Sequence, residues 1–445
     1  MTERVGRRRY LAAAVGGLAL SGCMELGSDD EGPSSDTSGG TTSRRSTDGS
    51  EPSETDAATD TEADEETETT TDAGLDEVVG SWNSHLGGVG RDSSVEHSGP
   101  SFPLDTVWET GLRQADYFLV DGGRLFYYDT SGSGSVQALD AATGEELWQQ
   151  GFGEFSPQNP ISIGDVLLAG DTAIDAETGE RLWRNDPDVS GYSYTLDLVE
   201  PTNGSTVFVP DADDSTPVGL RGLDPESGDE RWTTTLPESV ADHYLVPRTV
   251  TSDGSILYGT LGGVNGSADA PDHVGVDTST GEVLWTGDVA GYSADASRFY
   301  DAVGGLTAYD ARTGDVAWSV TRDDPGSLAL TGDRVLYVVG DQDPSGAELV
   351  ARSAATGEVD WRESLPALSA PDLKVAGDRA FVSYDSGADG ATSSGGVSPE
   401  MRVHAVADGS PEETLDGHNV LAIAENALFT VRYDGGGRLC ALATQ

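Results

Sequence analysis

Short runs of β-branched and aromatic residues, separated by polar turns, recur from about residue 103 to the end of the chain. They include "RLFYYD", "DVLLAGD", "STVFVPD", "RVLYVVGD" and "ALFTVRYD", and many of them follow Gly-Asp, Asp-Gly or Asn-Gly steps. Such steps are typical of hairpin turns, and runs of this length and composition are typical of strands. No segment has a sustained helical period, so the pattern predicts an all-β fold.

An eleven-residue motif occurs six times among these runs. It reads "ALDAATGEELW" at residues 138–148 and returns as "AIDAETGERLW", "GLDPESGDERW", "GVDTSTGEVLW", "AYDARTGDVAW" and "ARSAATGEVDW". Repeats of 33 to 53 residues, as here, are typical of solenoids and propellers, and four short strands per repeat favour a β-propeller. The motif glycines are Gly144, Gly179, Gly228, Gly281, Gly314 and Gly357, and the tryptophans are Trp148, Trp183, Trp232, Trp285, Trp318 and Trp361.

Each motif position has a predicted structural role. Asp140 and its equivalents are expected to cap a turn by accepting hydrogen bonds from backbone N–H groups, and Gly144 supplies a positive φ. Ala138 and its equivalents leave room for close packing, which we expect against a neighbouring blade. The tryptophan fills the space between blades. Because one blade cannot bury its faces alone, we expect the motif to build the fold rather than to hold a cofactor.

Two further copies are degenerate. Residues 402–415, "RVHAVADGSPEETL", keep an Asp-Gly turn and place Leu415 near the tryptophan position, whereas "RLCALATQ" ends the chain where the turn would begin. The outer strand that the last copy lacks has a candidate in "PLDTVWETGL" (residues 103–112), where Trp108 stands in for the absent tryptophan. Pairing the two ends removes an open sheet edge. We therefore predict an eight-bladed propeller of four-stranded antiparallel blades over residues 103–445, with seven blades as the alternative.

The N-terminal residues predict export and lipidation. A basic run precedes a short apolar run from Leu11 to Leu20, which is typical of a signal peptide. "RRRYL" resembles a twin-arginine signal, with Arg7 and Arg8 as the pair, and "LSGC" resembles a lipobox that ends at Cys23. We assign residues 1–23 to this signal, 24–78 to a disordered acidic Ser/Thr-rich tether and 79–102 to a lead-in segment. The expected location is the outer face of the cytoplasmic membrane, with the lipid on Cys23 as the anchor.

Charge narrows the class of partner. The net charge is −53, and Lys374 is the only lysine. Nucleic acid is excluded as a partner because phosphate binding needs a basic surface. This balance resembles that of haloarchaeal proteins, since molar salt screens the mutual repulsion of carboxylates; an acidic exported protein is the alternative. The second cysteine, Cys440, is not expected to form a structural disulfide.

Candidate chemistry is sparse. No histidine pair has metal-ligand spacing, so surface or loop positions are expected for the six histidines and no metal site is predicted. The acidic loops 211–217 and 341–346 lack the spacing of a known calcium loop, so we interpret them as solvated. "NGS" sequences make Asn203 and Asn265 possible N-glycosylation sites in an exported chain. The histidines are His85, His97, His243, His273, His404 and His418.

The motif A-x-D-x-x-T-G-x-x-x-W resembles the repeat of the PQQ-like β-propeller superfamily, which includes quinoprotein alcohol dehydrogenases and BamB-type lipoproteins. Residues 81–110 resemble the segment before the first blade in haloarchaeal PQQ-repeat lipoproteins. The dehydrogenases commonly carry adjacent disulfide-bonded cysteines beside the quinone, and this chain has neither a Cys-Cys pair nor a C-x-x-C-H haem site. The resemblance therefore implies the fold, and no PQQ cofactor is expected.

The expected function is that of a membrane-anchored, non-catalytic protein-interaction scaffold outside the cytoplasm, with an extracytoplasmic protein as its partner. One alternative is binding of a small ligand or a polysaccharide in the propeller funnel. A PQQ-dependent dehydrogenase is the less favoured alternative, because its cofactor needs cationic clamps and usually a calcium site.

Overall fold

The chain divides into two units, Met1–Glu66 and Thr67–Gln445, and every residue described below belongs to the second. The computed structural model describes residues 70–71, 75–84, 87, 93–112, 115–129, 134–151, 160–169, 172–184, 202–213, 216–240, 243–263, 272–289, 291, 293–321, 325–340, 346–366, 371–385, 399–433 and 437–444. Nearly all regular structure in these residues is β-strand, with one short 3-10 helix, η1 (Glu238–Val240). None of the described residues belongs to a helix that could cross a bilayer.

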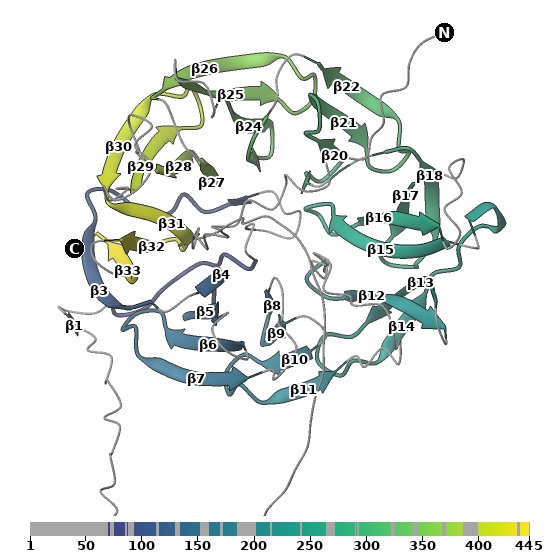
Figure 1. The fold of residues 1–445 in the computed structure, drawn as a ribbon, viewed down its shortest axis with the longest axis horizontal. Helices are drawn as coiled ribbons and strands as arrows, with labels where there is room; N and C mark the ends of the chain where they lie inside the picture. Colours follow the sequence, from purple (N-terminus) through teal and green to yellow (C-terminus); the bar gives the residue numbers. More distant parts are fainter. Residues whose placement is uncertain are drawn as a thin grey trace, which may run out of the picture. The chain divides into compact units, whose positions relative to one another are not determined.

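Eight small antiparallel sheets follow one another around a ring, which confirms the predicted eight-bladed propeller (Figure 1). Within each blade the strands are given from the inside of the ring outward. Blade 1 contains β4 (Ala115–Asp121), β5 (Arg124–Asp129), β6 (Ser135–Asp140) and β7 (Glu146–Gly151), and blade 2 contains β8 (Ile161–Ile163), β9 (Val166–Ala169), β10 (Thr172–Asp175) and β11 (Arg181–Arg184). Blade 3 contains β12 (Val207–Asp213), β13 (Thr216–Leu223) and β14 (Glu230–Thr233), and blade 4 contains β15 (His243–Val250), β16 (Ile256–Gly263), β17 (His273–Asp277) and β18 (Val283–Gly287). Blade 3 is described by three strands, and residues 185–201 before it lie outside the described residues.

Blade 8 joins the two ends of the ring. Blade 5 contains β19 (Ser293–Ala294), β20 (Arg298–Asp301), β21 (Leu306–Asp310) and β22 (Val316–Val320), and blade 6 contains β23 (Leu328–Leu330), β24 (Arg334–Val339), β25 (Ala347–Ser353) and β26 (Val359–Leu365). Blade 7 contains β27 (Asp372–Ala376), β28 (Arg379–Asp385), β29 (Pro399–Ala405) and β30 (Pro411–Asp416). Blade 8 contains β31 (His418–Ile423), β32 (Leu428–Tyr433), β33 (Gly437–Ala443) and β3 (Asp105–Gly111). Two short strands add to blade edges: β1 (Thr70–Thr71) lies beside β3, and β2 (Ser94–Val95) lies parallel to β27. The closing strand is therefore the predicted one, with Trp108 opposite Ala441.

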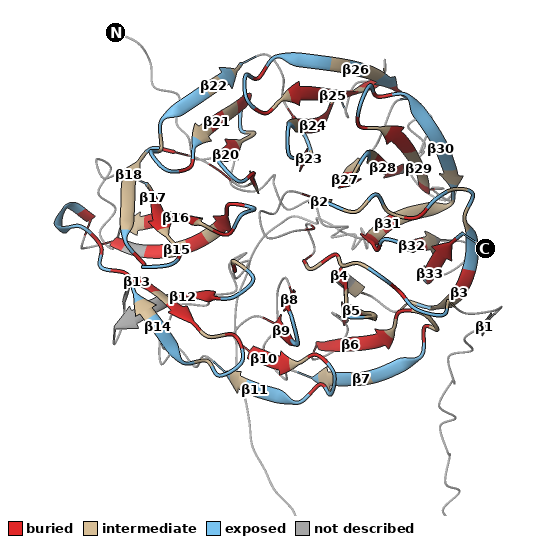
Figure 2. Cartoon of the chain, turned by 180° about the vertical axis from the view of Figure 1, so that it is seen from behind, coloured by how far each residue is buried: buried red, intermediate tan, exposed pale blue. Residues whose placement is uncertain are grey.

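The core lies within and between the blades rather than at a single centre. The second and third strands of the blades are mostly buried, whereas the outermost strands are mostly exposed (Figure 2). β6 is buried along almost its whole length, and the outer strand β7 alternates between exposed and half-buried positions. Each blade therefore buries its flat faces against its neighbours, as expected for a ring of short sheets.

One contact joins each blade to the next at seven of the eight seams. The tryptophan of an outer strand donates its indole N–H to a backbone carbonyl in the motif turn of the following blade, over 2.8 to 3.2 Å. Its ring lies directly over the glycine of that turn. These seven tryptophans are Trp108, Trp148, Trp183, Trp232, Trp285, Trp318 and Trp361.

The glycine of the turn is required for two reasons. The seven turn glycines have φ between +72° and +77°, a region that residues with a Cβ rarely adopt. A Cβ on any of them would also approach the tryptophan of the preceding blade to within 2.5 to 3.0 Å. The sequence revealed only the first reason, because the second arises from the neighbouring blade. The seven are Gly144, Gly179, Gly228, Gly281, Gly314, Gly357 and Gly409.

The aspartate of the motif organises the same turn. Oδ1 of Asp140 accepts hydrogen bonds from the backbone N–H groups of Ala142 and Thr143, at 3.0 and 2.9 Å. At the equivalent turn of blade 3, the backbone N–H of Ser227 and the guanidinium of Arg231 lower the pKa of Asp224 to about 2. The carboxylate of Asp224 therefore stays ionised, because the turn supplies hydrogen bonds to its charged form.

Two expectations about the motif were wrong. The small residue at position 138 lies opposite Trp148 of its own blade, not against a neighbouring blade; a Cβ on the equivalent Gly222 would lie 2.4 Å from Trp232 of that same blade. In blade 7 the register places Glu413, not Leu415, at the tryptophan position. Glu413 pairs with Val403 just as Trp148 pairs with Ala138 in blade 1.

The ring tryptophans differ in how far they are buried. The six motif tryptophans are half-buried, because they lie on the outermost strand with one edge toward solvent, whereas Trp108 is fully buried. The difference follows from the added cover that Trp108 receives from β1 and from the core of blade 8.

A pair of glycine substitutions separates the two demands on the turn. Gly123 has φ +73° with no atom within 4 Å of an added Cβ, whereas Gly281 has φ +74° and Trp232 at 2.5 Å. We expect Gly123→Ala to lower the free energy of unfolding by about 1–2 kcal/mol through backbone strain alone. Gly281→Ala should cost about 1–3 kcal/mol more, since the indole must move. Urea unfolding of both variants at one fixed KCl concentration measures the difference. Equal losses of unfolding free energy would contradict the role of the contact between Trp232 and Gly281.

His404 predicts a pH dependence of stability. Its side chain is 2 % exposed, Nδ1 lies 3.0 Å from the carbonyl oxygen of Gly409, and burial lowers its pKa below 6.5. The unfolded chain therefore takes up a proton near pH 6.5 that the folded chain refuses. Stability from this group is complete above about pH 7 and falls below pH 6.5, by at most about 1.4 kcal/mol per pH unit.

Replacement of His404 by Leu, the residue at the equivalent position 139, should make urea unfolding less dependent on pH between pH 7 and 5. The carboxylates whose pKa is lowered, such as Asp175, Asp277 and Asp408, lose their contribution only below their usual value of 3.8, outside this window. An unchanged slope in the variant would show that His404 is protonated in the folded chain.

Candidate functional site

The lead-in crosses the inner side of the ring. The backbone of Trp82 exchanges hydrogen bonds of 2.8 and 3.0 Å with Val120 of β4, the inner strand of blade 1. Asn83 accepts a hydrogen bond of 2.8 Å from Ser162 of β8, the inner strand of blade 2. Further along, β2 pairs with β27, the inner strand of blade 7 (Figures 1 and 2). The lead-in therefore covers the inner edges of three blades.

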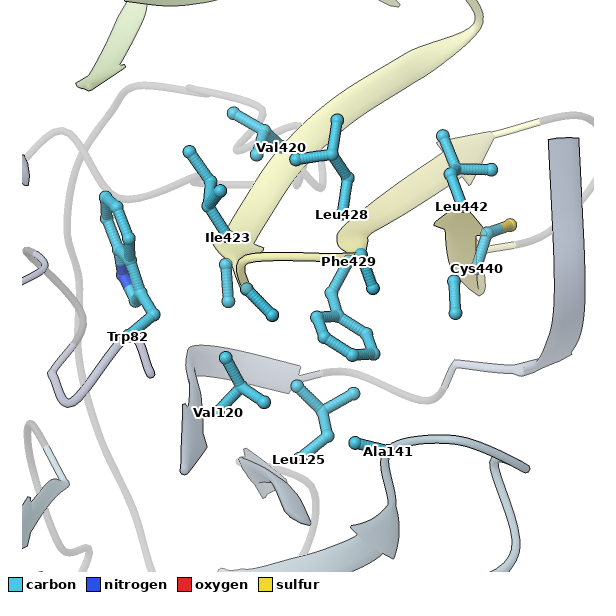
Figure 3. Packing of buried hydrophobic residues seen from close by; sticks show 14 of the residues in the cluster. Trp82, Val120, Leu125, Ala141, Val420, Ile423, Leu428, Phe429, Cys440 and Leu442 are labelled. Carbon is cyan, nitrogen blue, oxygen red and sulfur yellow. The ribbon is translucent and has the colours of Figure 1, made fainter. Parts of the chain in front are cut away.

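Trp82 anchors this crossing. It is fully buried and packs in the same apolar cluster as Val120, Leu125 and Ile423, which come from blades 1 and 8 (Figure 3). The ammonium of Lys374 lies 6.0 Å from the centre of its ring, a distance at which a cation is attracted to an aromatic face. Lys374 is 4 % exposed, and its ammonium also donates to the carboxylate of Asp372.

The seam between blades 7 and 8 lacks a tryptophan joint, and the lead-in occupies this seam. Arg379 of β28 donates to the carbonyl oxygens of Ser98 and Pro100, at 3.3 and 3.1 Å, and to the carboxylate of Glu412 at 3.0 Å. Its guanidinium also lies 5.7 Å from the centre of the Phe102 ring. The eighth joint thus uses an arginine and the lead-in backbone in place of an indole and a turn.

Backbone and amide hydrogen bonds fasten the beginning of the lead-in to blade 8. The carbonyl of Val79 accepts from the backbone N–H of Glu425 at 2.7 Å, and its own N–H donates to Oδ1 of Asn426 at 2.9 Å. The amide nitrogen of Asn426 donates to the carbonyl of Glu77 at 2.7 Å. A cleft of about 720 Å³ remains between these segments and Thr444 near the end of the chain.

The described inner strands do not fit a PQQ cofactor. A planar tricarboxylate needs cationic side chains, and the described inner strands carry only Arg248 and Lys374. Lys374 is buried and bound to Asp372, while Nε of Arg248 donates to Thr260 at 3.1 Å. Among the described residues, no group of three or more His, Cys, Asp or Glu side chains is placed to hold a metal ion. Neither the tricarboxylate nor its usual calcium therefore has a matching set of partners there.

The histidines are less exposed than expected. His243 and His404 are buried, and His273 and His418 are half-buried, all within strands. The expectation of surface or loop positions was wrong for these four, because a neutral imidazole can pack in a sheet: His273 stacks on Tyr258 at 5.4 Å, and burial lowers its pKa. His97 lies in the lead-in beside the cleft.

The structure places few of the other candidate residues. Asn203 lies in a turn, where its Oδ1 accepts from the backbone N–H groups of Ser205 and Thr206. Cys440 is buried, and its thiol donates to the carbonyl oxygen of Arg438 at 3.8 Å. Of the first acidic loop, residues 211–213 end β12 and residues 216–217 begin β13, while residues 214–215 lie outside the described residues. Outside the described residues lie Arg7, Arg8, Cys23, His85, Asn265 and residues 341–345 of the second acidic loop.

Sequence reasoning missed the role of the lead-in. Its only signal was one tryptophan, Trp82, in a polar stretch rich in glycine and serine. Arg379 gave no signal, because its partners are backbone carbonyls more than 270 residues away in the chain.

Three solved structures resemble the fold. A quinohemoprotein alcohol dehydrogenase, ADHIIG from Pseudomonas putida HK5, is 12% identical with a TM-score of 0.51, over 82% of this chain and 80% of that one. A europium-containing methanol dehydrogenase is 11% identical with a TM-score of 0.52, over 82% and 98%. BamB from Moraxella catarrhalis is 16% identical with a TM-score of 0.43, over 77% and 100%. At these identities the first two support the fold alone.

The sequence itself matches a family model. No curated protein is similar to the chain by sequence. The model described as outer membrane protein assembly factor BamB matches residues 105–292, 221–368 and 302–394. Together these matches cover more than half of the chain, so the chain belongs to this BamB-like family of PQQ-like β-propellers.

Proposed function

We propose that this chain is a non-catalytic protein-interaction scaffold, exported and held at the outer face of the cytoplasmic membrane by a lipid on Cys23. The observation that carries the proposal is the lead-in on the inner side of the ring. It pairs with the inner edges of blades 1, 2 and 7, where a cofactor or a small ligand in the funnel would have to compete with it. The outward surfaces and turns are left for a partner.

The family favours the same function. Its model is named for an assembly factor, and assembly factors act on other proteins. The dehydrogenases that share the fold are the source of the competing proposal, catalysis with PQQ. The described inner strands fit that cofactor poorly, since Lys374 is committed to Asp372 and to Trp82. Binding of a small ligand or a polysaccharide in the funnel is the second candidate, and the same crossing of the lead-in weighs against it.

Cross-linking in intact membranes tests the scaffold. Because the only lysine is 4 % exposed, amine-directed reagents have no good target, and a dihydrazide that couples activated carboxylates suits a chain with 78 acidic residues. We expect one protein to be captured reproducibly from membranes in molar KCl. The matched control is Cys23→Ser, which we expect to leave the membrane for the medium and to lose that capture.

Two results would overturn the proposal. Capture of no protein with the wild-type chain, together with a shift of its melting temperature by one sugar or metabolite, would favour the funnel ligand. A stoichiometric quinone absorbance after incubation with PQQ and Ca²⁺ would favour the dehydrogenase.

A further inference from the structure

A cleft lies where the ring closes. Its volume of about 720 Å³ is within the range of ligand-binding pockets, roughly 300–1,000 Å³. Lead-in residues on either side of Trp82 form much of its wall, and the β31–β32 turn and Thr444 complete it. It lies beside blade 8, whose outer strand β3 and third strand β33 are not joined by a motif turn.

Three side-chain donors in this wall, those of His97, Asn426 and Thr444, are already used within the protein. Nε2 of His97 lies 3.2 Å from the carbonyl oxygen of Ser81, so this nitrogen carries the proton and donates it. The amide nitrogen of Asn426 donates to the carbonyl of Glu77, and the hydroxyl of Thr444 donates to the carbonyl of Ser101. A ligand in the cleft therefore meets few free donors among these side chains.

The acceptors, in contrast, remain free. Nδ1 of His97 is buried and has no hydrogen-bond partner among the described residues. The carboxylates of Glu96 and Glu425 are exposed and form no hydrogen bond or ion pair within the described part of the chain. His97 and Glu425 converge on Gly80: a Cβ there would lie 3.1 Å from His97 Cδ2 and from Glu425 Cβ.

No cation in the wall balances these groups. The residues that line the cleft include neither Lys nor Arg. The nearest guanidinium that contacts the wall, Arg379, binds Glu412 and the carbonyl oxygens of Ser98 and Pro100. A cleft with charge of one sign attracts ligands of the opposite sign.

We infer that this cleft binds a basic side chain, an arginine above all, presented by a partner protein. A guanidinium brings five donors to a wall of free acceptors, and its planar fork suits carboxylates. Leu75, Val79 and Pro100 line the same cleft and would contact the methylene stem. This inference rests on the proposed scaffold function and specifies the chemistry of the partner.

Direct binding of a probe peptide tests the cleft without any partner. The probe is fluorescein-labelled Gly-Ser-Arg-Ser-Gly amide, and its counterpart carries citrulline in place of arginine. Fluorescence anisotropy of the full-length chain is recorded in 1 M KCl, where the Debye length is about 3 Å and only close contacts remain. We expect the arginine peptide to bind at least about tenfold more tightly than the citrulline peptide.

Matched variants locate that binding. Glu96→Gln with Glu425→Gln should weaken the arginine peptide about tenfold or more, because both charge-assisted contacts are lost. Glu146→Gln with Glu180→Gln removes the same charge from exposed sites on blades 1 and 2 and should change the affinity less than about twofold. Melting temperatures in the same salt show that both double variants are folded.

Equal losses in the two double variants, or equal binding of the arginine and citrulline peptides, would overturn the inference. A captured membrane partner combined with no peptide binding would overturn it while leaving the scaffold proposal intact. Peptide binding without a captured partner would contradict the scaffold proposal alone.

Discussion

The contact between an indole and the turn of the next blade is the constraint on which the ring depends. One blade is too small to bury its faces, so its stability comes from its neighbours. The indole covers the turn glycine and donates to the turn carbonyl, which fixes both the spacing and the orientation of adjacent blades. This single requirement explains why glycine and tryptophan return together with a constant spacing while the loops between the copies differ in length.

A closed ring of eight blades needs eight such joints, and the repeats supply seven. The eighth seam has Glu413 at the indole position and no turn to receive it. The lead-in meets this need through Arg379 and Phe102, and it continues across the inner side of the ring through Trp82. Ring closure, cover of the inner edges and the open cleft therefore have one structural cause, the split of blade 8 between the two ends of the propeller.

The sequence predicted the parts of the fold that are local or repeated. The motif gave the blade count, the turn chemistry and the closing strand at Trp108, because each depends on residues a few positions apart or on self-similarity. The sequence did not predict that Glu413 replaces tryptophan in blade 7, since the degenerate copy has no tryptophan that would mark this position. Nor did it predict the cleft, whose wall joins residues near 75–101 to residues near 425–444 and whose chemistry depends on which donors are already used.

The lead-in is the eighth joint of the ring and not an appendage to it. Hydrogen–deuterium exchange measures this directly, because amides that open only by global unfolding exchange at the slowest common rate. The amides of Trp82, Val375, Gly377 and Glu425 bond to or from the lead-in. They should exchange as slowly as the buried strands β5 and β32. Exchange of these amides that is orders of magnitude faster, with the blades still protected, would show that the ring closes without the lead-in.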